Sequence, residues 1–415
     1  MPILSRSADE WLLGRISKAI EPEPIRIVLG NEIAATTVEN PVATVVIPDR
    51  KTLLRLILDS EVAFGDAYAD GTIKVQGNLV KLLEAIYQAR SREGHDGSVF
   101  QRLASKWTQW LQGNTLPGSR RNIHAHYDLG NDFYKLWLDR QMVYTCAYFP
   151  TPAATLEQAQ TAKLDHICRK LRLQPGEAVV EAGCGWGALA LHMARQYGVA
   201  VKAFNVSHEQ IVFARQRAEE EGLSPQVEFV EDDYRNISGK FDVFVSAGML
   251  EHVGVENYKD LADVIQRSVG PSGRGLFHFI GKNQAAAYSR WMRKRIFPGA
   301  YIPALRQALE IFERWNYSVL DVENLRLHYA KTLEHWLERF EKSQQQVVSM
   351  YDSEFVRAWR LYLAGSMAAF RCGSLQLFQV VFTGSRCPPV WWTRAPLYTE
   401  AEPEIEKPEW MHATS

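Results

Sequence analysis

VVEAGCGWG, at residues 179–187, indicates the fold of this chain. An apolar run typical of a buried strand leads into it, and the helix-like segment 188–197 follows it. Glycine at alternate positions lets the backbone turn sharply and lets a ligand approach without a Cβ in the way. The spacing is not that of a P-loop, because no Gly-Lys-Ser/Thr follows, and it is not GxGxxG. The segment therefore predicts a strand-to-helix turn that holds a nucleotide-like ligand.

Strands and helices alternate on both sides of this turn. Buried strands are predicted over 178–181, 199–206, 227–230, 241–246 and 276–280, and helices over 188–197, 209–221 and 258–268. This alternation predicts an α/β fold with a parallel, doubly wound sheet. Ligands bind such sheets at the carboxyl ends of the strands, so the side chains that follow each strand are the candidates for a site.

An acidic residue that ends a strand before GxGxG is typical of enzymes that use S-adenosylmethionine. Glu181 can pair with the amino acid part of that molecule, while Gly183, Gly185 and Gly187 form the turn beneath it. The alternative is a tight turn with no ligand, which three glycines would weaken without any gain.

The next two strand ends offer polar side chains. Asn205 and Gln210 can hold a ribose, since Glu209, the acid near this strand, comes four residues late. Asp233 and Tyr234 follow the third strand and are placed to meet an adenine, although a solvated loop competes with this interpretation.

Glu251 and His278 come at the ends of the fourth and fifth strands, where substrate would meet cofactor. A carboxylate and an imidazole there indicate proton transfer. The structural alternatives are a helix cap for Glu251 and a core histidine for His278. Taken singly, the functional interpretation is preferred for these two, and the structural one for Cys146 and His252.

Composition is that of a globular protein expected in the cytoplasm. The 415 residues are 46% apolar and 23% charged, which predicts two domains of ordinary polarity. No apolar run approaches the ~20 residues of a membrane span, and no signal peptide begins the chain. The net charge of −1 gives no indication of nucleic-acid binding. Five scattered cysteines disfavour a disulfide framework and a zinc site, so no metal is expected.

Four regions follow from the pattern. Residues 1–90 read as a small α/β unit, with strands at 26–29 and 43–47 and amphipathic segments at 51–60 and 79–87. A linker is predicted over 91–121, with a helix-like stretch at 99–111 inside it. The catalytic domain takes residues 122–390, and a Pro- and Glu-rich tail takes 391–415.

Several motifs, in this order and spacing, resemble the cyclopropane-fatty-acyl-phospholipid synthases over about residues 50–385. They are FGDAYADG at 64–71, HYDLGND at 126–132, YTCAYF at 144–149, EAGCGWG at 181–187, GMLEHVG at 248–254, IFPG at 296–299 and LQLFQVVF at 375–382. The similar mycolic acid cyclopropane synthases lack the N-terminal unit and use carrier-bound chains, so its presence here favours a phospholipid substrate.

This resemblance implies a class I methyltransferase fold and a set of site residues. S-adenosylmethionine would lie near Tyr144, Thr145, Gly183, Gly185, Asn205, Gln210 and Tyr234. A bicarbonate ion would act as the base, held by Cys146 through its backbone, Glu251, His278, Ile280 and Tyr329. The N-terminal unit would bind lipid or form a homodimer, with the enzyme peripheral on the inner face of the membrane.

The implied chemistry is methyl transfer to an alkene. The resulting cation loses a proton from the transferred methyl group and closes into a ring. Aromatic rings such as Tyr127, Tyr148 and Phe149 can steady the cation. Three positions depart from the family: Glu181 replaces aspartate, Asn205 replaces threonine, and Ser366 stands where some members have cysteine.

The segment 290–297 (RWMRKRIF) mixes basic and large apolar residues and predicts a contact with anionic lipid, with a solvated helix face as the alternative. Three other functions stay open. The product can be methyl-branched or methylene-bearing, the substrate can be a small amine in an N-methyltransferase, or the protein can bind lipid or cofactor without catalysis.

Overall fold

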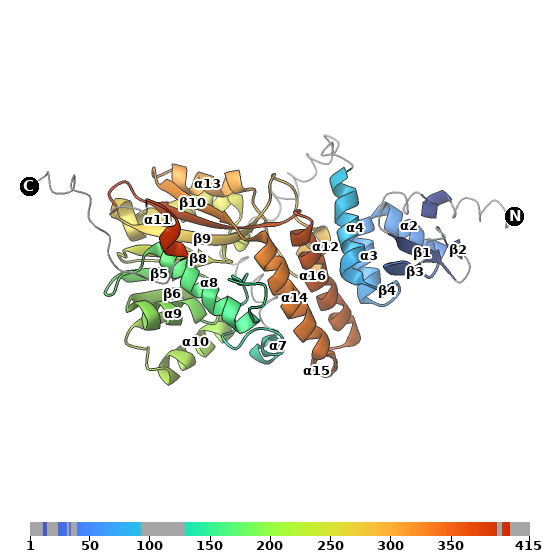
Figure 1. Cartoon of the computed structure of the whole chain (residues 1–415), viewed down its shortest axis with the longest axis horizontal. Coiled ribbons are helices and arrows are strands. Elements are labelled where there is room, and N and C mark those ends of the chain that lie inside the picture. The colour runs from blue at the N-terminus through green and yellow to red at the C-terminus, as the bar shows by residue number, and fades with distance from the viewer. Residues whose placement is uncertain are drawn as a thin grey trace, which may run out of the picture.

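The computed structural model describes residues 11–14, 24–30, 33–34, 40–92, 129–387 and 392–398. It shows a large α/β unit, a small N-terminal α/β unit, and long helices between them (Figure 1). Most of the predicted linker, the helix-like stretch 99–111 and the end of the tail lie outside the described residues.

The large unit is built on a seven-stranded sheet with the order β10-β11-β9-β8-β5-β6-β7. Five neighbouring strands run parallel, as the sequence predicts. They are β5 (Ala178–Ala182), β6 (Ala200–Asn205), β7 (Val227–Glu231), β8 (Val243–Ala247) and β9 (Arg274–Gly281). Their carboxyl ends therefore meet along one edge, where the candidate site residues follow them.

Two strands extend this sheet beyond the prediction. β11 (Gln376–Thr383) is antiparallel both to β9 and to β10 (Ser318–Asn324), so the sheet is mixed and not wholly parallel. All eight residues of β11 are buried, and β10 is largely exposed. β10 shows no clear apolar alternation, whereas β11 has an apolar run that is compatible with a buried strand. The antiparallel pairing of both strands with the sheet is what the sequence did not predict.

Helices cover both faces of the sheet. One face carries α8 (Leu156–Leu171), α9 (Ala188–Tyr197) and α10 (His208–Glu220), and the other carries α11 (Tyr258–Val269) and α13 (Leu305–Glu313) (Figure 1). Successive residues of a strand point to opposite faces. Val179 accordingly joins the core under α8 to α10, while Val180 joins the core under α11 and α13.

The N-terminal unit has a four-stranded sheet with the order β2-β1-β3-β4. Its strands are β1 (Ile25–Leu29), β2 (Ile33–Ala34), β3 (Ala43–Ile47) and β4 (Lys74–Gly77), and its helices are α2 (Arg50–Leu58), α3 (Ser60–Ala69) and α4 (Leu79–Arg92). The two predicted strands and both amphipathic helices are confirmed. Asp49 begins α2 by accepting a hydrogen bond from the Thr52 backbone N at 2.7 Å.

Two long helices, α14 (Arg326–Lys342) and α16 (Ser353–Arg371), stand between the sheet and the N-terminal unit (Figure 1). The shorter α7 (Asn131–Lys135), α12 (Arg290–Arg295) and α15 (Gln344–Met350) lie around them. α16 packs on both α3 and α4, and one apolar core runs from the N-terminal unit through α14 and α16. The two units are therefore joined by a shared core.

α12 is attached to α3 of the N-terminal unit. Trp291 Nε1 donates to Asp66 Oδ1 at 3.2 Å, and Arg295 donates to both Asp66 oxygens at 2.9 and 2.8 Å. The Trp291 ring lies against Gly65, where an added Cβ would be 2.3 Å from ring atom Cδ1. Glycine at position 65 is therefore needed for this contact.

This attachment corrects the prediction for segment 290–297. Trp291, Met292 and Ile296 are buried inside the protein and offer no apolar surface to a membrane. Arg290 pairs with Asp59 at 3.1 Å, as Arg295 does with Asp66. Within the described residues, no helix combines the length and the apolarity that crossing a bilayer requires.

Candidate active site

The glycine turn leaves β5 with a backbone that requires glycine. Gly183, Gly185 and Gly187 have φ values of +84°, +54° and +83°, in the left-handed region. An added Cβ on Gly183 would lie 2.9 Å from Met249 Cβ. At Gly185 an added Cβ would meet nothing within 4 Å. The turn is packed on one side and open at Gly185, as a surface that cradles a ligand must be.

Glu181 ends β5 directly before this turn. Its side chain is 2% exposed, and Oε2 has no hydrogen-bond partner among the described residues. Burial raises the pKa of Glu181 to about 8, against the charge of Lys163, which lowers it. A buried carboxylate oxygen without a donor is costly, and a bound ammonium group such as that of S-adenosylmethionine would satisfy it. The carboxylate therefore fits this molecule.

Asn205 and Gln210 meet beside the turn, as their predicted shared role requires. Asn205 Nδ2 donates to Gln210 Oε1 at 2.6 Å and contacts Gly185 O at 3.5 Å. Asn205 ends β6, and Gln210 is buried in the first turn of α10. The amide pair thus lies at the carboxyl edge of the sheet next to the glycines.

Asp233 and Tyr234 follow β7 in a short 3-10 helix, Tyr234–Asn236. The Asp233 carboxylate accepts from the Arg235 backbone N at 3.0 Å and lies 3.2 Å from the Arg235 guanidinium. Burial raises the pKa of Tyr234 to about 12, so this phenol stays protonated. Both side chains hold the loop after β7, beside the place predicted for the adenine.

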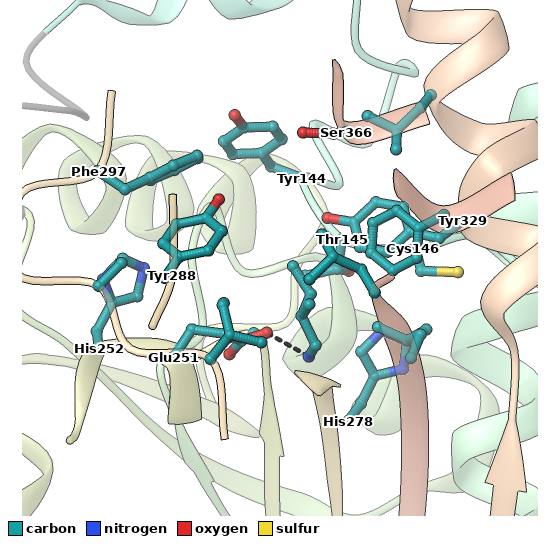
Figure 2. A pocket seen from close by; sticks show the side chains of 18 of the residues that line it. Tyr144, Thr145, Cys146, Glu251, His252, His278, Tyr288, Phe297, Tyr329 and Ser366 are labelled. Carbon is teal, nitrogen blue, oxygen red and sulfur yellow. Dashed lines mark hydrogen bonds between the residues drawn. The ribbon is translucent and has the colours of Figure 1, made fainter. Parts of the chain in front are cut away.

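A cavity of about 70 Å³ gathers the remaining predicted residues (Figure 2). Its lining includes Tyr144, Thr145, Cys146, Glu251, His278, Ile280 and Tyr329. These come from the segment after α7, from the ends of β8 and β9, and from α14. The space is large enough for a small ion or a few waters, since one water needs ~10–15 Å³ of such volume. All five residues predicted to hold the base are therefore brought together.

Glu251 presents one oxygen to the backbone and one to this cavity. Oε1 accepts from the Ile280 backbone N at 2.6 Å, the dashed line of Figure 2. Oε2 is buried and has no partner within the described part of the chain. Burial raises the pKa of Glu251 to about 7, and the bond from Ile280 opposes this rise. The carboxyl group can thus accept or give a proton near neutral pH.

His278 lies in β9 opposite Gln379 of β11. Its Nδ1 is 3.1 Å from Gln379 Nε2, and its Nε2 is buried without a partner among the described residues. Burial lowers the pKa of His278 well below its ordinary value, so the ring is neutral. Because the Gln379 amide donates to Nδ1, the ring hydrogen is on Nε2. Gln379 had no signal in the sequence, since only strand pairing brings it to the histidine.

Helix α14 fixes the segment that carries Cys146. Thr332 Oγ1 accepts from the Ala147 backbone N at 3.0 Å, and His328 Nδ1 accepts from the Phe149 backbone N at 2.9 Å. The Cys146 thiol is fully buried and contacts Ala147 O at 3.2 Å. Burial raises its pKa well above the ordinary value, so the sulfur is a thiol and not a nucleophile.

The aromatic prediction is wrong for Tyr148 and Phe149. Tyr148 is stacked between His166 and His328, with ring centroids 4.3 and 4.8 Å away, and Phe149 stacks on His335 at 5.5 Å. Neither ring is part of the cavity lining, and Tyr127 lies outside the described residues. The aromatic rings that do line it are Tyr144, Tyr288, Phe297, Tyr329, Tyr362 and Phe370.

Two of these rings are hydrogen-bonded to each other, a pair that sequence reasoning missed. The hydroxyls of Tyr144 and Tyr362 are 2.6 Å apart, and Tyr362 comes from α16. Phe297 stands on the same side of the cavity, above His252 and Glu251 (Figure 2). The IFPG motif at 296–299 could have pointed to Phe297, whereas Tyr362 is one of many apolar residues of a buried helix.

Known proteins resemble this chain over most of its length. Residues 116–380 match the family described as mycolic acid cyclopropane synthetase. The probable fatty acid methyltransferase of Pseudomonas putida is 33% identical over 391 residues, which cover 90% of this chain and 96% of that protein. The cyclopropane-fatty-acyl-phospholipid synthase of Escherichia coli strain K12 is 39% identical over 288 residues, 69% of this chain and 71% of that protein.

A solved structure shares the fold of the large unit. The mycolic acid cyclopropane synthase CmaA1, complexed with SAH and CTAB, aligns with a TM-score of 0.61 and 29% identity over 63% of this chain and 97% of that chain. The family match spans more than half of the sequence and includes every residue of the cavity and the glycine turn. This chain belongs to the mycolic acid cyclopropane synthetase family and is similar within it to the cyclopropane-fatty-acyl-phospholipid synthases.

Proposed function

We propose that this protein is a cyclopropane-fatty-acyl-phospholipid synthase. It transfers a methylene group from S-adenosylmethionine to the cis double bond of an unsaturated acyl chain in a membrane phospholipid, with bicarbonate as the base. One observation carries this proposal. Glu251 Oε2 and His278 Nε2 are buried polar atoms without partners in the described structure, and both residues line the same small cavity.

Two small molecules supply the reacting groups in this proposal. S-adenosylmethionine, when bound, provides a methyl carbon on a sulfonium, and bicarbonate, when bound, provides a base. The side chains of the chain that would bind S-adenosylmethionine are Tyr144, Thr145, Glu181, Asn205, Gln210, Asp233 and Tyr234, around the turn formed by Gly183, Gly185 and Gly187. The net change in the lipid is one added carbon and two added hydrogens, because one methyl proton leaves as the ring closes.

The base site is built to hold a small oxyanion. His278 donates through Nε2–H, and Glu251, when protonated, donates through Oε2. Tyr329 and the backbone of Cys146 complete the wall. Such a set of neutral donors can position a base while taking no part as a nucleophile.

The cavity also protects a reactive cation. An alkene is a poor nucleophile, so the sulfonium must be held in line with the π bond in a dry pocket. Near neutral pH the lining has a protonated Cys146 and neutral histidines, since burial lowers the pKa of His252 to about 4 and that of His278 well below its ordinary value. The Cys146 sulfur is a thiol and not a thiolate, and His278 presents Nε2–H, which has no free lone pair, so neither group is a strong nucleophile toward the cation.

Access to lipid is proposed through the N-terminal unit. Helix α2 exposes Leu54, Ile57 and Leu58, the last to 86%, on the same short helix as Lys51 and Arg55. Apolar and basic side chains together favour an anionic membrane surface. We infer peripheral attachment to the inner face of the membrane here, in a cytoplasmic homodimer.

The test uses the full chain with vesicles of cis-unsaturated phospholipid and methyl-labelled S-adenosylmethionine. A ring product is expected to give proton NMR signals upfield of tetramethylsilane. Mass alone cannot distinguish a ring from a methylene group, because both add the same atoms. Vesicles of saturated phospholipid are the control and should take up no label. Labelling of soluble amines with none in unsaturated vesicles would contradict the proposal.

A second candidate is a fatty acid methyltransferase with a methyl-branched or methylene product. It is favoured by the likeness to the Pseudomonas putida protein, which spans 90% of this chain and is called a probable fatty acid methyltransferase. The two candidates share the methyl transfer. A methylene or an unsaturated methyl-branched product then forms by loss of a proton without ring closure, and a saturated methyl branch would also require a hydride donor from a separate reductant. The same NMR spectrum separates them, because a branched or methylene product has no upfield ring protons.

A further inference from the structure

Lys163 is a buried cation behind the cavity that the proposed mechanism does not use. It lies on α8, its side chain is 2% exposed, and its Nζ donates to Thr145 Oγ1 at 2.9 Å. No carboxylate of the described residues lies within ion-pair distance of this ammonium group. A buried ammonium without an anionic partner is costly, so its retention calls for a reason.

Two carboxylates, those of Asp139 and Glu181, act on Lys163 from beyond ion-pair distance. Burial lowers the pKa of Lys163 to about 8, while the charges of Asp139 and Glu181 raise it. The Asp139 carboxylate already accepts from the backbone N atoms of Gln141 and Val143, at 3.0 and 2.8 Å. Lys163 is therefore not needed to satisfy Asp139, and its one direct partner is the hydroxyl of Thr145.

Thr145 connects Lys163 to the cavity. It lines the cavity, and its methyl carbon Cγ2 packs on Gly248, where an added Cβ would lie 2.9 Å away. Gln160, one turn before Lys163 on α8, donates to the Thr145 backbone O at 2.9 Å. These three contacts thus hold the side chain and the backbone of Thr145 in place. Because Oγ1 accepts from Lys163, the hydroxyl hydrogen remains available to donate elsewhere.

The cavity lacks a cation of its own. Its described lining contains no lysine or arginine, and its two histidines are held neutral by burial. Glu251 adds negative charge once it ionises. An anion that entered such a space would be repelled unless a positive charge stood nearby.

We propose that Lys163 is a positioning residue that supplies the positive charge for a carboxylate-type oxyanion at the Thr145 side of the cavity, acting through the Thr145 hydroxyl. This rests on the proposed function, because both candidate anions come from it. One is bicarbonate and the other is the carboxylate in the amino acid part of S-adenosylmethionine. Both offer planar oxygen pairs to a hydroxyl donor backed by an ammonium group.

The test compares Lys163→Met with the unmodified full chain. Methionine keeps the length and removes the charge. Affinity for SAH, which retains the amino acid carboxylate, is measured by calorimetry, and affinity for ¹³C-bicarbonate is measured by NMR line broadening. At least one affinity is expected to fall by about tenfold or more, as the loss of a nearby charge in a poorly solvated site requires. Which one falls identifies the anion, and wild-type affinity for both would overturn the proposal.

The thermal stability of Lys163→Met distinguishes a positioning role of Lys163 from a structural role. Replacing a buried, unpaired ammonium by an apolar side chain of similar size should leave the thermal midpoint unchanged or raise it. Should Lys163→Met fail to fold, Thr145→Val and Thr145→Ser answer the question with Lys163 in place. Thr145→Val should lose the same affinity as Lys163→Met, and Thr145→Ser should retain it. Equal binding by the valine and serine variants would contradict the proposal.

The proposed role of Lys163 and the proposed synthase activity can be refuted separately. A wild-type chain that binds SAH and bicarbonate but forms no ring would refute the synthase activity and leave the role of Lys163 to the binding data. A Lys163→Met chain that binds both ligands normally would refute the role of Lys163, whatever the product.

Discussion

Gln379 Nε2 lies 3.1 Å from His278 Nδ1, across the antiparallel pair β9 and β11, with both side chains buried. The imidazole is neutral because burial lowers its pKa. The amide N–H therefore donates to Nδ1 and leaves the ring hydrogen on Nε2, which has no partner among the described residues. A residue 101 positions away thus selects the tautomer that can donate into the cavity.

Gln379→Met should lower kcat about fivefold, since one net hydrogen bond is worth ~1 kcal/mol. The substitution keeps the volume and removes the donor, so both tautomers of His278 become populated. Steady-state turnover on unsaturated vesicles gives the rate. Gln379→Glu should lose more, because a carboxylate accepts from Nδ1–H and turns Nε2 into an acceptor. A wild-type kcat in Gln379→Glu would refute the tautomer assignment.

Glu251→Gln should lose turnover by about 10²- to 10⁴-fold, the usual contribution of a proton-transfer group. The amide can still accept from Ile280 N, so the fold around the 3-10 helix Leu250–His252 and β9 is kept. Affinity for SAH, measured by calorimetry, should stay within about twofold of wild type by this argument. Glu313→Gln, on an exposed position of α13, is the matched control and should change neither quantity. An equal loss of turnover in Glu251→Gln and Glu313→Gln would argue against a specific role of Glu251.

Glu181→Gln should be more stable than wild type, and the difference should grow from pH 5 to pH 8. Burial raises the pKa of Glu181 from 4.5 to about 8 in the folded protein. Between these values the folded state binds more protons than the unfolded state, so the contribution of Glu181 to stability falls as pH rises. Glutamine does not titrate and removes this loss.

Thermal unfolding without ligand at pH 5, 6, 7 and 8 measures this difference, which should reach a few kcal/mol at ~1.4 kcal/mol for each unit of pKa shift. The same variant should bind SAH more weakly, because it lacks the charge that pairs with the ammonium group. A stability difference that is constant with pH would contradict the buried, raised pKa.

Gly65→Ala should destabilise the protein by about 1–3 kcal/mol, the usual cost of overpacking. The added methyl would lie 2.3 Å from the Trp291 ring and would push α12 away from α3. Because Phe297 follows α12 and lines the cavity, activity should fall as well.

Gly365→Ala is the control for helix propensity. Gly365 lies within α16, has no positive φ, and an added Cβ would meet nothing within 4 Å. Alanine there should stabilise the protein by about 0.5–1 kcal/mol. Denaturant unfolding of both variants measures the two effects, and a gain of stability in Gly65→Ala would show that the α3–α12 contact is not tight.

Local patterns in the sequence were sufficient for several parts of the fold. The turn at 179–187, strands β5 to β9 and helices α9 to α11 each depend on neighbouring residues, and all are found within a few positions of their predicted bounds. The convergence of strand ends also predicted that Glu251 and His278 would meet, and the family resemblance implied that Ile280 and Tyr329 would join them, as the cavity lining shows.

Other features could not be read in this way. No local pattern shows that β10 and β11 pair antiparallel with the sheet, and the burial of segment 290–297 depends on its contact with α3. Tyr148 and Phe149 turn away from the cavity because His328 and His335 on α14 stack against them.

The sequence by itself determined the central strands along the chain, the glycine turn and, through the family resemblance, the residues predicted to hold the base. The tertiary structure alone decided which atoms of those residues are free: Glu251 Oε2 and His278 Nε2 are left over because Ile280 N and Gln379 occupy their other atoms. It also decided that Lys163 lies behind Thr145. Hydrogen bonding and burial between distant segments set these relations, and no local pattern encodes a partner that pairing and packing bring together.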